Sequence, residues 1–355
     1  MDLPPLYAII MAGGSGTRFW PASRRSRPKQ YLRIASEEAL LLETWRRIEG
    51  FIPAERILVV TTVDQIDRVR ETLPDLPAEN IICEPQARNT GPCVAMAALE
   101  IKRRDPDSIQ IVLPADHVIR PREAFHRSLK AAAEEALHDS LVVFGIRPSH
   151  PATGFGYIEA GEMSREVRHT PVYRVRQFVE KPDLRKAQEF LFQGSFFWNA
   201  GIFVWRTSAI SKALEEYMPE CYAGLSEKRE PAELAELYGK QHSESVDDSI
   251  IERAPNLRKL PIDYFWSDVG SWDALANVLP TDDDANVVSG GTELIAEASH
   301  GCISHGEEGE LIALVGVQNL VVVHADNATL VCHRDRVQDV RGLVERIRDG
   351  KPEFL

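Results

Sequence analysis

The stretch LYAIIMAGGSGTRFWPASRRSRPKQY, residues 6–31, joins a short apolar run to a glycine-rich turn and then to a cluster of basic residues. A continuous apolar run followed by turn residues predicts a buried strand of a parallel sheet. Glycine lacks a Cβ, so the amides after such a strand can converge on an anion. No acidic residue lies between Leu3 and Ser36, although the chain has a formal net charge of -13. A basic loop in an acidic chain indicates a site for one small anionic ligand.

The composition is that of a folded globular protein with more than one core. A chain of 355 residues, 44% of them hydrophobic, exceeds the size of one ordinary core. No apolar run approaches the roughly 20 residues that a membrane helix needs, and the first residues lack the features of a secretory signal. The five cysteines form no CxxC pair, which favours a cytoplasmic protein. The negative charge argues against nucleic acid as a partner.

Strands and helices are predicted to alternate as far as about residue 280. Short apolar runs predict strands over 6–11, 57–61, 109–113, 141–145, 172–179 and 201–205. Helical spacing of apolar residues predicts helices over 90–103 and 122–138. We therefore expect an α/β domain over 1–280, a doubly wound and mostly parallel sheet with ligands at the C-terminal ends of its strands. Brief β-like runs and a last amphipathic stretch predict a small β-rich domain over 281–355 that ends in a helix; no fixed-period repeat is evident.

Two familiar phosphate-binding loops do not fit the glycine turn. A Walker A loop needs Lys and then Ser or Thr after its last glycine, but Gly16 is followed by Thr17 and Arg18. A dinucleotide fingerprint needs a third glycine where Phe19 stands, which weakens the alternative of a dinucleotide-dependent oxidoreductase. For the glycines alone, a plain turn with solvated arginines remains an alternative.

The remainder of the loop is stiffened by two prolines. Pro21 and Pro28 restrict the backbone, and a rigid loop loses less entropy when it positions a cation. Arg18 and Lys29 can then bind a polyphosphate from two sides, the arginine as a planar fork and the lysine as a point charge. This favours a polyphosphate-binding loop over a plain surface turn.

The motif GGSGTRFWPxSRxxxPKQY, residues 13–31, resembles the nucleotidyltransferase loop of the sugar-nucleotide pyrophosphorylases. The full motif, with Pro28, Lys29 and Gln30 near its end, is most similar to the members that make GDP-mannose. The resemblance continues in order over most of the chain, through EPxxRNT, LPADH, TGFGYI, EKP, NAGI, SVDxxxxE and WSDVGSW. It implies a Rossmann-like nucleotidyltransferase that transfers GMP from GTP to mannose 1-phosphate and uses one or two Mg²⁺ ions. Relatives commonly associate, so a homo-oligomer such as a dimer is also expected.

The implied reaction needs positioned charge rather than a general base, because a phosphate monoester, with its second pKa at about 6, is already an anionic nucleophile. The resemblance assigns catalysis to Arg18, Lys29, Asp116 and Asp268. Asp116 follows the predicted strand over 109–113, where a hard carboxylate suits Mg²⁺, and Asp268 is the second expected metal ligand. The alternative for Asp116 alone is a helix cap or a turn.

The resemblance also implies two binding sets. The nucleotide-binding set is Ala12, Gly13, Gly14, Ser15, Gly16, Thr17, Arg18, Glu84, Arg88, Asn89 and Thr90. The sugar-phosphate-binding set is Gly156, Tyr157, Glu180, Lys181, Asn199 and Gly201. Which polar residue of the first set contacts guanine is left open. Asp247 and Glu252 match the family pattern without a role that the residues suggest.

Two other functions stay open. The same machinery could act on another sugar 1-phosphate, for example a heptose, as a guanylyl- or uridylyltransferase. A regulatory homologue could keep the fold and lose catalysis, although all four catalytic candidates are present.

Overall fold

The computed structural model describes residues 3–14, 16–227 and 230–355. The chain divides into two compact units. The first unit consists of Met1–Gly13, Ile48–Pro114 and Arg120–Phe265, and the second consists of Gly14–Arg47, Ala115–Ile119 and Trp266–Leu355. The second unit thus contains most of the glycine loop as well as the C-terminal segment. A domain boundary at residue 280 stays a prediction.

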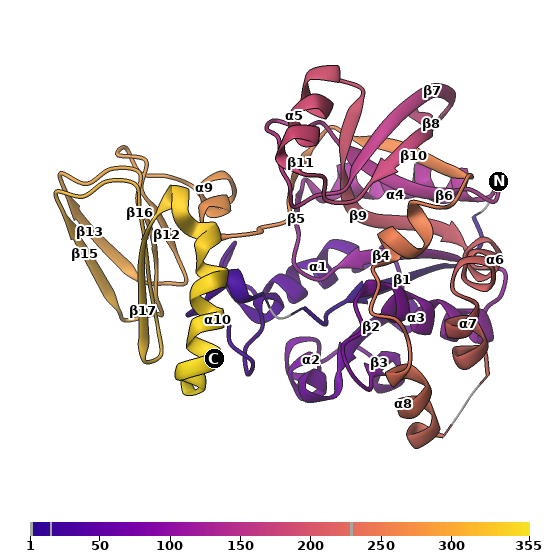
Figure 1. Ribbon diagram of the computed structural model, residues 1–355, viewed down its shortest axis with the longest axis horizontal. Coiled ribbons are helices and arrows are strands. Elements are labelled where there is room, and N and C mark those ends of the chain that lie inside the picture. Colours follow the sequence, from indigo (N-terminus) through magenta and orange to yellow (C-terminus); the bar gives the residue numbers. More distant parts are fainter. Residues whose placement is uncertain (1–2, 15, 228–229) are drawn as a thin grey trace. The chain divides into compact units, whose positions relative to one another are not determined.

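The first unit is built on a nine-stranded sheet (Figure 1). In spatial order its strands are β3 (Ile81–Glu84), β2 (Ile57–Thr62), β1 (Leu6–Met11), β4 (Ile109–Pro114), β9 (Phe196–Arg206), β6 (Leu141–Ile146), β10 (Leu257–Ile262), β8 (Thr170–Val179) and β7 (Tyr157–Val167). Strands β3, β2, β1 and β4 run parallel, whereas β9 runs antiparallel to β4 and β6. This mixed sheet confirms the expected α/β fold.

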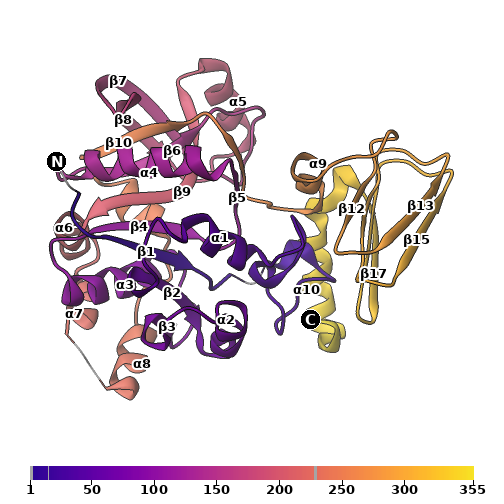
Figure 2. The same ribbon diagram turned by 180° about the vertical axis from the view of Figure 1, so that it is seen from behind.

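Both faces of the central strands are covered. Tyr7 and Ile9 of β1 belong to one hydrophobic core with helix α3 (Thr90–Arg104), and Ala8 and Ile10, which alternate with them along the strand, are fully buried. Successive side chains of a strand point to opposite faces, so burial of all four requires cover on both sides. Helix α4 (Arg122–Ala136) packs against β6 and β9 (Figure 2). Further helices of this unit are α2 (Ile66–Thr72), α5 (Leu184–Gln193), α6 (Thr207–Tyr217), α7 (Pro219–Leu225) and α8 (Pro231–Gly239).

The strands that the sequence predicts best are those buried on both faces. The runs over 6–11, 57–61, 109–113 and 141–145 are confirmed as β1, β2, β4 and β6 to within one residue. Strand β7 was not predicted, because its second half is largely exposed and carries polar residues that hide the strand pattern.

The second unit contains stacked β-strands that form successive coils of the chain. Strands β12 (Val287–Ser289), β14 (Ile303–His305) and β16 (Leu320–Ala325) pair in parallel, and β17 (Ala328–His333) pairs with β16 in the antiparallel sense. Strand β13 (Glu293–Glu297) pairs in parallel with β15 (Leu311–Val315). Val287, Ile303 and Val321 occupy equivalent positions in the stack. Their unequal spacing along the chain explains why no fixed-period repeat is evident in the sequence.

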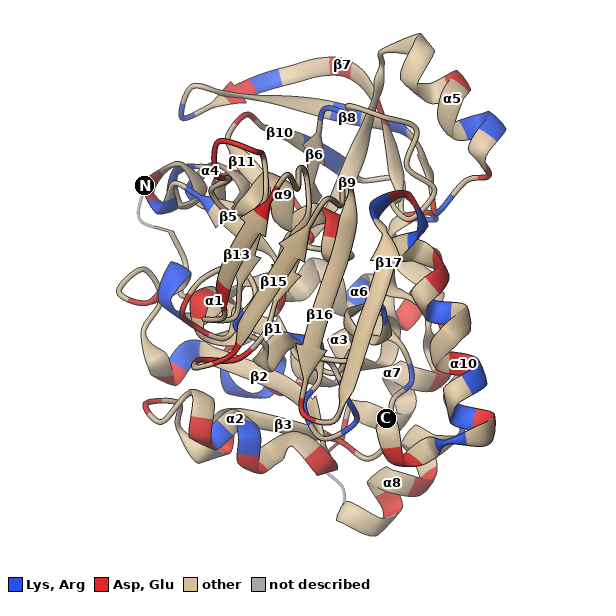
Figure 3. Cartoon of the chain, turned by 90° about the vertical axis from the view of Figure 1, so that its left-hand side faces the viewer, with Lys and Arg blue, Asp and Glu red and all other residues tan. Residues whose placement is uncertain are grey.

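Strands β15, β16 and β17 of this stack contain no Lys, Arg, Asp or Glu (Figure 3). Ile295 of β13 and Leu311 and Val315 of β15 are exposed apolar side chains. A homo-oligomer stays a prediction. None of the helices in the described ranges combines the length and the apolar character that crossing a bilayer requires.

One hydrophobic core holds the second unit together. It contains Phe19 and Trp20 from the glycine loop, Trp272 from the WSDVGSW segment, and Val340 and Val344 from the terminal helix α10 (Val340–Gly350). The rings of Phe19 and Trp272 meet edge to face with their centroids 4.8 Å apart. The loop, the WSDVGSW segment and the last helix are therefore fixed to one another by packing.

Candidate active site

The glycine loop folds back on itself at Gly16. This residue has a φ of 60°, and a Cβ built on it would lie 2.2 Å from the Cβ of Lys29. Only glycine tolerates both the backbone angle and the close approach. The Ser23 hydroxyl donates a hydrogen bond of 2.7 Å to the Gly16 carbonyl. The fold-back therefore places Lys29 beside the start of the loop.

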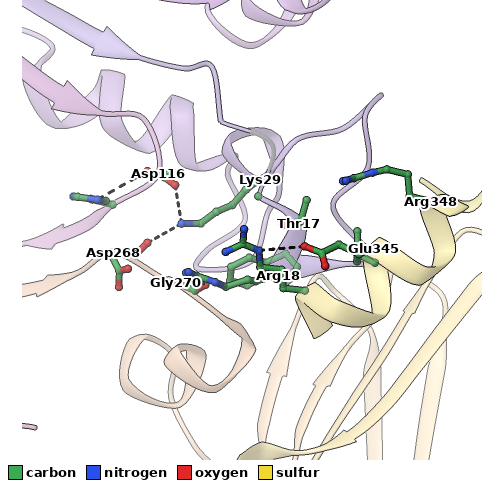
Figure 4. A pocket seen from close by; sticks show the side chains of 13 residues that line it. Thr17, Arg18, Lys29, Asp116, Asp268, Gly270, Glu345 and Arg348 are labelled. Carbon is green, nitrogen blue, oxygen red and sulfur yellow. Dashed lines mark hydrogen bonds and ion pairs between the residues drawn. The ribbon is translucent and has the colours of Figure 1, made fainter. Parts of the chain in front are cut away.

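The Lys29 ammonium lies between the two predicted metal-binding residues (Figure 4). Its Nζ donates to Oδ2 of Asp116 and to the carbonyl oxygen of Asp268, both at 2.7 Å. The Lys29 side chain is 8% exposed, and a buried cation is stable only when it is paired. Lys29 thus connects the glycine loop to the segments that contain Asp116 and Asp268, which are distant in the sequence.

The carboxylate of Asp268 is held by an unusual turn. Val269 has a φ of 44°, which is unfavourable for a β-branched residue and is a kind of strain found at functional sites. A Cβ on Gly270 would lie 2.7 Å from Oδ2 of Asp268, so glycine makes room for the carboxylate. The Arg18 guanidinium donates to the Gly270 carbonyl at 3.3 Å, which brings Arg18 to the same turn.

The Lys29 ammonium dominates the electrostatics of this cluster. Burial by itself would raise the pKa of Asp116, but the Lys29 ammonium outweighs burial and the pKa is lowered. Burial raises the pKa of Asp268 in spite of Lys29, and the negative charge of Asp116 adds to the rise. Burial lowers the pKa of His117 to about 4, so its imidazole is neutral near pH 7. Lys29 is thus the positive charge that stabilises the Asp116 carboxylate and opposes the effect of burial on Asp268.

The four catalytic candidates line one pocket of about 470 Å³. Arg18, Lys29, Asp116 and Asp268 all belong to the second unit. The same pocket is lined by His117 and by residues of α10. The sequence does not predict that α10 contributes to this pocket, because no local pattern in the helix indicates contact with a loop more than three hundred residues earlier.

Asp116 and Asp268 fit a hard divalent cation. Mg²⁺ in phosphate-transfer sites takes one or two protein carboxylates and completes its coordination with phosphate and water. The described residues hold no group of three or more His, Cys, Asp or Glu side chains that could bind a metal on their own. The Lys29 ammonium beside these residues indicates that positive charge is stabilised there.

In the first unit, Glu84 lies beside the start of the glycine loop. The Ala12 amide donates to the Val60 carbonyl at 2.8 Å, which continues the sheet. A Cβ on Gly13 would lie 3.1 Å from Oε2 of Glu84. Oε1 of Glu84 accepts a hydrogen bond from the Tyr238 hydroxyl, and the side chain is 3% exposed. Burial raises the pKa of Glu84, although the bond from Tyr238 opposes the rise.

The other polar members of the nucleotide-binding set are used by the scaffold. The Arg88 guanidinium donates to the Gly239 carbonyl. Asn89 caps α3, with its Oδ1 accepting from the Thr90 amide at 2.9 Å. The Thr90 hydroxyl accepts from the Val246 amide at 2.9 Å. Ser15 lies outside the described residues, whereas Thr17 lines the pocket of the second unit.

Members of the sugar-phosphate set lie together in the first unit. Glu180 and Lys181 form an ion pair, and a Cβ on Gly156 would lie 2.5 Å from Oε2 of Glu180. Burial alone would lower the pKa of Lys181, but the bond to Glu180 and the charge of Asp247 raise it. The ammonium is therefore held in its charged form.

Asn199 bonds Asp247, a carboxylate near this ion pair to which the sequence motifs assign no role. Its Nδ2 donates to Oδ1 of Asp247 at 2.8 Å, and its Oδ1 accepts from the Gly201 amide at 3.1 Å. Burial and the nearby Glu180 raise the pKa of Asp247 to about 7. The Tyr157 hydroxyl donates to the Ala152 carbonyl at 2.9 Å, and its ring is fully buried, so Tyr157 is a packing residue in this structure.

The two glycines at 14 and 16 give a matched test of the loop geometry. We expect Gly16→Ala to lower the free energy of unfolding by about 1–3 kcal/mol, because the methyl group collides with Lys29 and φ is positive. Gly14→Ala should change it by less than about 0.5 kcal/mol, since no atom lies within 4 Å of the added Cβ. Urea unfolding of both variants measures this. Equal destabilisation would contradict the fold-back at Gly16.

Comparisons with known proteins cover nearly the whole chain. Residues 7–285 match the nucleotidyl transferase family, and residues 292–347 match the MannoseP isomerase/GMP-like beta-helix domain. The chain is 37% identical to a mannose-1-phosphate guanylyltransferase of Klebsiella pneumoniae, over 98% of this chain and 74% of that one. It is 38% identical to the xanthan biosynthesis protein XanB of Xanthomonas campestris, over 96% and 73%.

A solved structure is similar over both units. The crystal structure of a protein described as mannose-1-phosphate geranyltransferase from Thermus thermophilus has a TM-score of 0.87 and 32% identity to this chain. The similarity covers 97% of this chain and 99% of that one. The chain therefore belongs to the nucleotidyl transferase family and is a nucleotidyltransferase of the group that contains the mannose-1-phosphate guanylyltransferases.

Proposed function

We propose that this enzyme transfers GMP from GTP to mannose 1-phosphate, giving GDP-mannose and pyrophosphate. The observation that carries the proposal is the convergence of Arg18, Lys29, Asp116 and Asp268 on one pocket. Two relatives that match over 98% of this chain are named mannose-1-phosphate guanylyltransferase, which supports the choice of substrates.

The chemistry requires charge more than it requires proton transfer. The phosphate oxygen of the sugar phosphate forms a bond to the α-phosphorus of GTP, and the bond from that phosphorus to the bridging oxygen breaks with its electron pair leaving on pyrophosphate. Arg18 and Lys29 would bind the phosphates from two sides. Both are already held in place, by the Gly270 and Asp268 carbonyls, so little reorganisation is needed when charge develops.

Asp116 and Asp268 would hold Mg²⁺. When bound, this ion supplies positive charge that polarises phosphoryl oxygens and stabilises the leaving diphosphate. The turn at Val269 and Gly270 fixes the Asp268 carboxylate, and the Lys29 bond fixes the Asp116 carboxylate. The chain thereby keeps two hard oxygen ligands in one place before substrate arrives.

Glu84 is the residue that we assign to guanine. The base presents two neighbouring donors, N1–H and the N2 amino group, and the two lone pairs of the carboxylate oxygen that does not bond Tyr238 can accept from them. Arg88, Asn89 and Thr90 each make a hydrogen bond to the scaffold. Oε1 of Glu84 accepts from Tyr238, which leaves Oε2 as its acceptor for a ligand. Glu84 ends β3, at the edge of the sheet where ligands of parallel strands bind, and its Oε2 faces Gly13.

The sugar phosphate would bind at the Glu180–Lys181 pair. Lys181 supplies a cation for the phosphate, while Glu180, Asn199 and the Gly201 backbone can bond sugar hydroxyls. Asp247 holds the Asn199 amide with its NH₂ group turned toward the carboxylate, which fixes the way the amide presents its oxygen.

The proposal places the enzyme in the cytoplasm as a homodimer. All five cysteines are free thiols, which is typical of proteins from reducing compartments. The exposed Ile295, Leu311 and Val315 of the β-stack support association with a second copy.

A substrate survey with one loop variant tests the proposed reaction. Pyrophosphate release should be fastest with GTP and mannose 1-phosphate and should require Mg²⁺. Lys29→Ala should lower kcat/KM about 100-fold or more, because it removes a preorganised cation from the phosphates. Arg25→Ala, an exposed cation of the same loop, should leave the rate unchanged.

The survey also separates the alternatives. Faster turnover with UTP or with a heptose 1-phosphate would replace the proposed substrates. Failure to release pyrophosphate from any nucleoside triphosphate would favour a regulatory homologue. Full activity of Lys29→Ala with unchanged far-ultraviolet circular dichroism would contradict the role of the loop.

Inosine triphosphate, which lacks the N2 amino group of GTP, tests the assignment of Glu84. The wild type should prefer GTP over ITP, and Glu84→Gln should reduce this preference about tenfold or more, because the one amide oxygen stays on Tyr238 and the NH₂ group then faces the donors of the base. Gln86→Ala, which removes an exposed neighbour, serves as the control. The readout is the ratio of kcat/KM for the two nucleotides. A GTP preference that survives in Glu84→Gln would assign guanine recognition to another residue.

A further inference from the structure

The terminal helix α10 forms one wall of the pocket that contains the catalytic candidates. Arg341, Val344, Glu345 and Arg348 line it. The helix packs against Thr17–Phe19 of the glycine loop, and Glu345 and Arg348 project from it (Figure 4). Residues three and four apart lie on the same side of a helix, so these three charged side chains form one face of α10. Every residue of this wall belongs to the second unit.

This wall is attached to the segments that carry the catalytic candidates. Val340 and Val344 are each 3% exposed in the core that also contains Phe19 and Trp272. Before the helix, Nε2 of Gln338 donates to the Ser271 hydroxyl at 3.0 Å. After it, the Trp20 indole donates to the Phe354 carbonyl at 2.9 Å. Hydrogen bonds before and after the helix therefore attach it to the segments that carry the catalytic candidates.

The charges of α10 are suited to an anion. Nε of Arg341 lies 3.7 Å from Oε1 of Glu345, which leaves the other guanidinium nitrogens free to bond a ligand. In the part of the chain that the structure describes, the Arg348 guanidinium has neither a hydrogen bond nor an ion pair. Arginine is the side chain whose fork matches phosphate oxygens.

The pocket as a whole gains positive charge from this helix. Arg18 and Lys29 face the carboxylates of Asp116 and Asp268, so without α10 the lining is close to neutral. The two arginines of α10 outnumber Glu345, so the lining has an excess of positive charge. A divalent cation on Asp116 and Asp268 would increase this excess further. A diphosphate group needs such an excess, because it carries several negative charges within one small volume.

We propose that Arg341 and Arg348 of α10 bind the β- and γ-phosphates of the nucleotide and the pyrophosphate that leaves. This inference rests on the proposed function, and it makes the last helix a substrate-binding element rather than only a closure of the β-stack. The terminal helix and the part of the glycine loop that packs against it would then bind the same phosphates.

Titration of the purified enzyme with inorganic pyrophosphate and Mg²⁺, followed by calorimetry, tests this without turnover. Arg348→Glu should weaken pyrophosphate binding more than tenfold, because a charge-assisted bond is lost and a repulsive charge is added. Arg348→Lys should recover part of the affinity. Arg346→Glu on the same helix is the matched control, since Arg346 is exposed and does not line the pocket.

Kinetics in both directions gives a second readout. The KM for pyrophosphate in the reverse reaction and the KM for GTP in the forward reaction should rise in Arg348→Glu, while the KM for the sugar phosphate stays within about twofold. Unchanged thermal melting of the variants confirms that they fold. Equal pyrophosphate affinity in wild type, Arg348→Glu and Arg346→Glu overturns the inference.

The outcomes keep this inference apart from the proposed function. If Arg348→Glu turns over GTP and mannose 1-phosphate with unchanged KM values, the role of α10 is overturned and the proposed function is not affected. Loss of pyrophosphate binding in Arg348→Glu supports that role even where the survey selects another nucleotide or sugar.

Discussion

The pairing of the Lys29 ammonium with the Asp116 carboxylate and the Asp268 carbonyl is the interaction on which the candidate active site depends. A nearly buried ammonium without partners would be strongly unfavourable, so these three residues must stay together. The requirement extends to Gly16, where any side chain would collide with Lys29. Each part of the cluster therefore constrains the position of the others.

The fold supplies the segments that meet at Lys29 in two ways. Strands β1 and β4 lie side by side and parallel, so the loop after β1 and the residues after β4 begin at the same edge of the sheet. Packing brings the remaining segments together, because Phe19, Trp272 and Val344 share one core. The C-terminal helix is thus part of the site, because its side chains pack in this core and line the pocket.

Much of this could be predicted from the sequence. Strands such as β1 and β4 are buried on both faces and read as continuous apolar runs, which local patterns report well. The four catalytic candidates were found through motifs, and the structure brings them to one pocket. Their roles, and those of the two binding sets, stay predictions until they are tested.

Other features leave no local signal. Arg341 and Arg348 resemble ordinary surface residues of an amphipathic helix until the fold places them beside Arg18. Arg88 and Asn89 fit a ligand-binding motif, yet one guanidinium nitrogen of Arg88 donates to Gly239 and Oδ1 of Asn89 caps α3. Asp247 acquires a raised pKa from its burial and from Glu180. In each case the deciding partner lies far away in the sequence or depends on burial.

A crystal structure with a non-hydrolysable GTP analogue and Mg²⁺ is the most direct test of the central claim. We expect the triphosphate to lie in the pocket of the second unit, with phosphate oxygens within hydrogen-bond distance of Arg18 and Lys29 and the metal on Asp116 and Asp268. A triphosphate bound away from Lys29, with the Lys29–Asp116 pair undisturbed and no metal on either carboxylate, would contradict the account.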